Sequence, residues 1–122
     1  MSLLLPPAPV RLAVFAAAAA TIAWLSLSPT ESLPQGLTFW DKAEHAAAYL
    51  GLALIGAWTF PGHLLRVAGG LFAAGIGVEV LQAVMGMGRQ GDPMDALANT
   101  VGILLGMTLA VIIGRLHRAR VR

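Results

Sequence analysis

Most residues able to do chemistry in this chain lie in three short stretches. DKAEH (41–45) places four ionisable groups directly before an apolar run, and EVLQ (79–82) places an acid and an amide inside another. GRQGDPMDALAN (88–99) combines a base, two acids and two amides, in a chain with only six acidic and eight basic residues. Carboxylates and imidazoles transfer protons, and Lys and Arg bind phosphates. The first hypothesis is therefore an acid–base or anion-binding site.

The spacing of the first two groups predicts that each lies on one face of a helix. Asp41, His45 and Tyr49 recur every four residues, and Glu79 and Gln82 are three apart. Side chains three or four residues apart share a helix face. Glu79 lies about 12 Å inside its apolar run, too deep to reach water easily. A carboxylate at such a depth in a membrane is by default a functional-site candidate.

The third group continues into a packing motif. Asp95, Asn99, Gly102 and Gly106 lie on one helix face, and the two glycines form G-x-x-x-G, which lets a neighbouring helix approach closely. We therefore expect the polar groups of this face to point at other helices and not at lipid.

Composition places these stretches in a membrane protein. The chain of 122 residues is 57% hydrophobic and 11% charged, and its mean hydropathy is +0.76. Soluble domains carry about 25% charged residues. The absence of cysteine excludes disulfides and thiolate chemistry. The pI is near 9.9, but the net charge is only +2 and most bases lie in one short tail, so no nucleic-acid partner is predicted.

Four apolar segments are long enough to cross a bilayer, which needs about 17–25 residues. They predict an all-α integral membrane bundle of four transmembrane helices, forming a single domain over 1–122, with spans at 12–28, 43–60, 67–87 and 95–114. The first segment is Ala-rich and is alternatively a secretory signal that is cleaved. Pro29 directly after it argues against cleavage, so we predict that it is retained.

The basic residues predict the orientation. If the spans alternate, six of the eight lie on one side and only Lys42 and Arg89 on the other. By the positive-inside rule both termini are then cytoplasmic, in a bacterial inner membrane, and the polar ends of spans two to four face outward. The six residues on the cytoplasmic side are Arg11, Arg66, Arg115, Arg118, Arg120 and Arg122.

Several of these residues have a purely structural alternative. Asp41 and Asp95 are also typical of helix N-termini, where acids favour the macrodipole. Lys42 and Arg89 are typical anchors at a membrane surface. Glu44 lies off the stripe of Asp41, and we expect it to be exposed at the headgroup level.

Three motifs in series resemble the VanZ-like family of small membrane proteins. They are DKAEHAAAY, EVLQ and an Arg followed by DALANTVGILLG, and together they run from about Trp40 to Gly106. The family is named for a member linked to teicoplanin resistance. The resemblance implies a membrane-embedded polar site but no particular reaction. The characteristic positions that it implies are Asp41, Lys42, His45, Tyr49, Glu79, Gln82, Arg89, Asp95 and Asn99.

We expect this site to bind or act on an anionic, lipid-linked cell-envelope intermediate, and the resemblance implies a link to glycopeptide (teicoplanin) resistance. His45, Glu79, Asp41 and Asp95 are the candidate acid–base residues, with the buried Glu79 as a second proton carrier. The candidate substrate-binding residues are Arg89, Lys42, Tyr49, Gln82 and Asn99.

Catalysis itself is left open, and no cofactor is predicted. Asp41, His45, Glu79 and Asp95 have the chemistry of metal ligands, but their spacing matches no known metal motif and the bases nearby disfavour a cation, so no metal is predicted. Two alternatives remain: a non-catalytic membrane binding or scaffold module whose polar cluster is structural, and a proton-coupled transporter subunit. The oligomeric state is also open.

Overall fold

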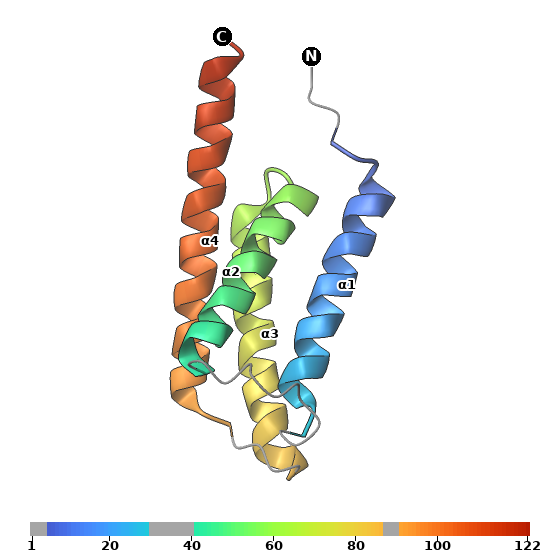
Figure 1. Ribbon diagram of the computed structural model, residues 1–122, viewed down its shortest axis with the longest axis vertical. Helices are drawn as coiled ribbons and strands as arrows, with labels where there is room; N and C mark the ends of the chain where they lie inside the picture. The colour runs from blue at the N-terminus through green and yellow to red at the C-terminus, as the bar shows by residue number, and fades with distance from the viewer. Residues whose placement is uncertain (1–4, 30–40, 87–90) are drawn as a thin grey trace.

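The computed structural model describes residues 5–29, 41–86 and 91–122, without the side chain of Asp41. These residues form four α-helices and no strand, which confirms the all-α fold. Helix α1 spans Ala8–Leu27, α2 Asp41–Thr59, α3 Leu64–Met85 and α4 Pro93–Arg120. The helices run alternately down and up, so the start of α1 and the end of α4 lie at the same end of the bundle (Figure 1).

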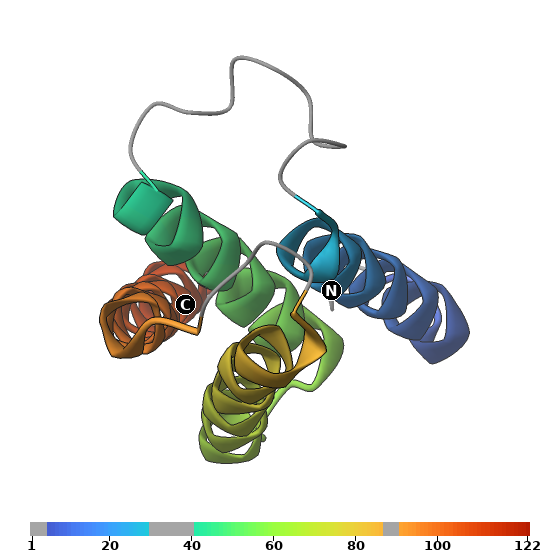
Figure 2. The same cartoon turned by 90° about the horizontal axis from the view of Figure 1, so that it is seen from below.

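Helix α2 is the central element of this arrangement. It lies between α1 and α4, with α3 across from it (Figure 2), and it contacts all three of the other helices. Helix α1 is peripheral and has no fully buried residue. It meets the rest of the bundle partly through Phe15, whose ring packs edge-on against that of Phe60 at 5.5 Å between centroids.

The helix ends follow from local sequence signals. Before α3, Gly62 adopts φ +82°, and after α3 Gly86 adopts φ +60°, the left-handed conformation that ends many helices. Helix α4 begins with an Asp-Pro pair: the side chain of Asp92 accepts a hydrogen bond from the Met94 amide at 2.8 Å, and Pro93 occupies the first helical position.

Helix α4 continues beyond the predicted apolar span. That span ends near residue 114, whereas the helix runs to Arg120. Hydropathy locates the bilayer and not the end of backbone hydrogen bonding, and Arg and Leu are good helix formers. Basic residues in the last turn also interact favourably with the helix dipole.

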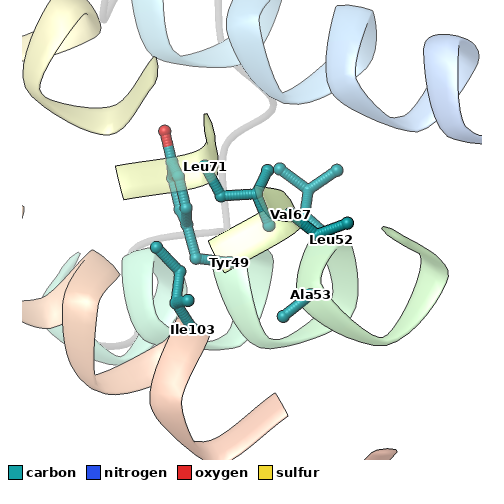
Figure 3. Close-up of a cluster of buried hydrophobic side chains, with 6 residues drawn as sticks. All are labelled: Tyr49, Leu52, Ala53, Val67, Leu71 and Ile103. Atoms are coloured by element: carbon teal, nitrogen blue, oxygen red, sulfur yellow. The ribbon is translucent and has the colours of Figure 1, made fainter. Parts of the chain in front are cut away.

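The apolar core lies among α2, α3 and α4 (Figure 3). It combines three residues of α2, two of α3 and one of α4: Tyr49, Leu52, Ala53, Val67, Leu71 and Ile103. Many large apolar side chains instead lie on the outer surface, including Val84 at 72% exposed and Leu104 at 61% exposed. Buried polar groups beneath such a surface are the arrangement expected of a protein that lipid surrounds.

Three described helices, α1, α3 and α4, are long and apolar enough to cross a membrane. Helix α2 does not reach the same hydropathy. Its first turn carries Lys42, Glu44 and His45, which lower the average over its 19 residues. Helix α2, which falls below this hydropathy, contacts each of the other three helices.

The G-x-x-x-G prediction is confirmed at the contact between α2 and α4. A Cβ on Gly102 would overlap the backbone carbonyl of Ala46. A Cβ on Gly106 would lie 2.7 Å from the Leu50 carbonyl oxygen and 2.6 Å from the Ala53 Cβ. Because there is no side chain at either position, the two backbones touch, and this contact fixes the register of α2 against α4.

Arg11 has a structural role that its charge alone did not indicate. Its guanidinium donates hydrogen bonds to the carbonyls of Trp58 and Thr59, at 3.0 and 2.9 Å. These are among the last carbonyls of α2, which have no partner within the helix. Arg11 therefore ties the start of α1 to the end of α2.

Candidate functional site

The candidate site lies at the end of the bundle opposite the termini. There α2 and α4 begin and α3 approaches its end (Figure 1), so residues of α2 and α4 that are fifty or more positions apart become neighbours. The close contact at Gly102 brings the first turns of α2 and α4 together. The ionisable side chains of both helices consequently face each other across a short gap.

Lys42 joins the start of α2 to the start of α4. Its ammonium group contacts Asp92 Oδ2 at 2.6 Å and also contacts Asp95 Oδ1. Hydrogen bonding to Asp92, and then to Asp95, raises the pKa of Lys42. The hydrogen bond from Lys42, and then the one from the Met94 amide, lowers the pKa of Asp92. Both Lys42 and Asp92 lie just before the predicted spans, and their ion pair crosses between the two helices.

His45 lies one turn deeper, between two residues of α4. Its Nδ1 is 3.1 Å from Asn99 Oδ1, and its Nε2 is 3.5 Å from Asp95 Oδ2. The amide oxygen of Asn99 can only accept, so Nδ1 carries the hydrogen in this contact. That tautomer places the lone pair of a neutral imidazole on Nε2, the nitrogen that faces Asp95. Asn99 therefore orients His45 for acid–base or ligand chemistry.

Glu79 reaches the same region from α3. Its Oε2 accepts a hydrogen bond from the Asp92 amide at 2.9 Å, which ties α3 to the start of α4. The side chain is only 8% exposed. Its other oxygen, Oε1, is buried and has no hydrogen-bond partner among the described residues. A buried carboxylate oxygen without a partner is costly.

One donor atom each from His45, Glu79 and Asp95 lies within 4.8 Å of the others.

The predicted stripe of α2 is confirmed for His45, which faces α4, and for Tyr49, which is buried in the core. Tyr49 also borders the site: a Cβ on Gly75 would lie 3.4 Å from its hydroxyl oxygen and 3.3 Å from Asn99 Nδ2.

One predicted site residue, Gln82, makes its contact in another part of the bundle. The amide nitrogen of Gln82 donates to the Ser26 carbonyl at 2.6 Å, so its contact is with the end of α1. Glu44 is exposed, as expected. Asp41 is the first residue of α2, but its side chain lies outside the described part, as does the whole of Arg89.

No family model, curated protein or solved structure matches this chain. The chemistry of the site is therefore argued from its geometry. A continuous path runs from Glu79 through Asp92, Lys42 and Asp95 to His45, and then to Asn99. Such a path can orient a proton-transferring imidazole, and its carboxylates can hold a cation.

Asp92 is the residue of this network that the candidate set from the sequence omitted. It caps α4, pairs with Lys42 and donates its amide to Glu79. An Asp-Pro pair before an apolar helix is an N-terminal signal and could have identified the cap. The contact with Lys42 has no local signal, because it depends on how α2 and α4 align.

Proposed function

We propose that this chain is a four-span protein of the bacterial inner membrane, with both termini in the cytoplasm. Helix α2 is the fourth span: its 19 residues extend about 28 Å. Helix α2 packs against the three other helices, and its polar first turn lies at the end of the span, where the exposed Glu44 would meet lipid headgroups. The Arg-rich end of α4 favours the cytoplasmic side, which places the site of Lys42, His45, Glu79 and Asp95 on the outward side.

The proposed function of this site is to bind, or act on, the anionic headgroup of a lipid-linked cell-envelope intermediate. The observation that carries the proposal is the position of the ionisable network: side chains from α2, α3 and α4 meet one another at one end of an apolar bundle, where lipid headgroups would lie. Lys42 and Arg89 are the two basic residues of the chain assigned to that side. A phosphate would be held by such bases, Arg through two parallel hydrogen bonds.

The same residues support a further proposal, that the chain is related to the VanZ-like family. Lys42, His45, Glu79, Asp95 and Asn99 come from the three motifs that carry the resemblance, and their side chains share one network. If the headgroup is also chemically changed, His45 is the proposed acid–base group. Asp95 and Asn99 would then position it.

One observation favours a second candidate, a non-catalytic module. Lys42 already contacts two carboxylates, and Glu79 holds the Asp92 amide. A network of this kind also stabilises helix packing without any ligand. In that case the network would be required for folding, but no lipid headgroup would depend on it.

The test is mass spectrometry of the lipids that copurify with the detergent-extracted protein. We expect the parent to retain a phosphate-bearing lipid class that Arg89→Ala loses at least tenfold. Arg66→Ala is the matched control, since this exposed arginine lies at the opposite end of the bundle, and it should retain the parent's profile. Identical lipid profiles for the parent and Arg89→Ala would refute headgroup binding.

A further inference from the structure

The described part of the site has an excess of negative groups. The described part contains one ammonium group, that of Lys42, and three carboxyl groups, those of Glu79, Asp92 and Asp95. The ammonium group contacts the carboxyl groups of Asp92 and Asp95. Lys42 occupies Oδ1 of Asp95, while Oδ2 faces His45.

The geometry of His45 and Asp95 fits a shared metal ion. The 3.5 Å between His45 Nε2 and Asp95 Oδ2 is long for a hydrogen bond. It is close to the distance of about 3.4 Å between two ligand atoms of a tetrahedral ion with bonds of roughly 2.1 Å. The contact between Nδ1 and Asn99 gives the imidazole the orientation that metal-binding histidines receive from an outer partner.

Glu79 supplies the independent observation. Its Oε1 is buried, and no described residue gives it a hydrogen bond. The donor atom of Glu79 lies within 4.8 Å of those of His45 and Asp95. A side-chain adjustment of about 1 Å would bring all three to bonding distance of one ion. A bound cation would give this oxygen the partner that it lacks.

We infer that His45, Glu79 and Asp95 form a binding site for a single divalent transition-metal ion, with Zn²⁺ as the best fit. One imidazole and two carboxylates are hard or borderline ligands, and the imidazole favours Zn²⁺ over Mg²⁺ or Ca²⁺. Three protein ligands leave a fourth position open. Asn99 and Lys42 orient His45 and Asp95 from outside the coordination sphere.

Basic residues near the candidate ligands were expected to disfavour a cation. The contacts of Lys42 remove this objection for that residue. Lys42 does not compete with the ion for the same oxygen, because it contacts Asp95 Oδ1 and not Oδ2. The cation site does not depend on the proposed headgroup function. If both hold, the open position would accept a phosphate oxygen, and the ion would add its positive charge to those of Lys42 and Arg89.

The experiment is a Zn²⁺ titration of the detergent-solubilised, chelator-stripped protein against a competing fluorescent chelator. We expect the parent to bind one Zn²⁺, and Glu79→Gln and Asp95→Asn each to lose at least about 100-fold in affinity. The control variants His63→Ala and Glu44→Gln alter exposed ligand-type residues outside the cluster and should bind like the parent. Far-ultraviolet circular dichroism checks that each variant is folded.

X-ray absorption spectroscopy of the Zn²⁺-loaded parent gives a readout that does not depend on any variant. A first shell of nitrogen and oxygen with one imidazole is the expected result. A parent that binds no Zn²⁺, a shell with no imidazole or with two or more, or affinity unchanged in Glu79→Gln and Asp95→Asn would each overturn the inference. Zn²⁺ binding as expected, together with identical lipid profiles for the parent and Arg89→Ala, would refute only the headgroup function.

Discussion

Replacing Gly102 with alanine is expected to lower the free energy of unfolding by about 2–3 kcal/mol, the upper range for an overpacked contact. A Cβ at this position would overlap the Ala46 carbonyl oxygen, which belongs to the backbone and cannot rotate away. Helix α2 would have to move off α4. Because Lys42 and His45 lie on the adjoining turn of α2, the same displacement would separate them from Asp92, Asp95 and Asn99.

Gly114→Ala is the matched control on the same helix. At Gly114 a Cβ would meet only the flexible end of the Arg118 side chain, at 3.8 Å. Alanine favours a helix over glycine by about 1 kcal/mol, so this variant should be as stable as the parent or slightly more stable. Reversible unfolding in mixed micelles, followed by helical circular dichroism, measures both. Equal effects at the two glycines would show that α2 and α4 are not in backbone contact.

Replacing Asn99 with leucine is expected to weaken Zn²⁺ binding by about 10- to 100-fold, the usual effect of removing an outer partner of a metal ligand. Asn99 is 3% exposed and orients the imidazole of His45 through Nδ1. Leucine has a similar volume but accepts no hydrogen bond, so the imidazole loses its preferred tautomer and orientation. The same chelator competition that measures the parent's affinity measures this loss.

Thr100→Val is the control for Asn99→Leu. The Thr100 hydroxyl donates to the Ala96 carbonyl of its own helix at 2.8 Å, so its loss should leave Zn²⁺ affinity unchanged. Unfolding measurements on Asn99→Leu distinguish a role of Asn99 in positioning His45 from a role in stabilising the fold. If Asn99→Leu loses stability but binds Zn²⁺ with the parent's affinity, Asn99 has a packing role only.

The sequence predicted the parts of this structure that depend on periodicity. His45 and Tyr49 share an inward face, Glu79 is buried, and Gly102 and Gly106 allow close contact, because spacing along a helix determines which residues share a face. Contacts between side chains of different helices could not be predicted from this spacing. The partners of Lys42 lie fifty or more positions away, and they depend on the register that the two glycines set.

Other features differ from the sequence predictions for physical reasons. Hydropathy treats each helix as if lipid surrounded it, so it could not show that α2 packs against the other three helices. The role of Arg11 was hidden because its partners are backbone carbonyls of α2, which have no sequence signature. Helix α4 extends beyond the predicted apolar span because the basic tail is polar but still helical.

The central claim is that the network of Lys42, His45, Glu79 and Asp95 lies on the outward side of the membrane. The chain contains no cysteine, so a single introduced cysteine is the only thiol of the protein that a maleimide can label. Glu44→Cys places the thiol on the exposed side of α2 beside the network, and Arg120→Cys places one at the opposite end. A membrane-impermeant maleimide applied to intact cells should label Glu44→Cys, and it should label Arg120→Cys only after the membrane is permeabilised. Labelling of Arg120→Cys and not Glu44→Cys in intact cells would contradict the account.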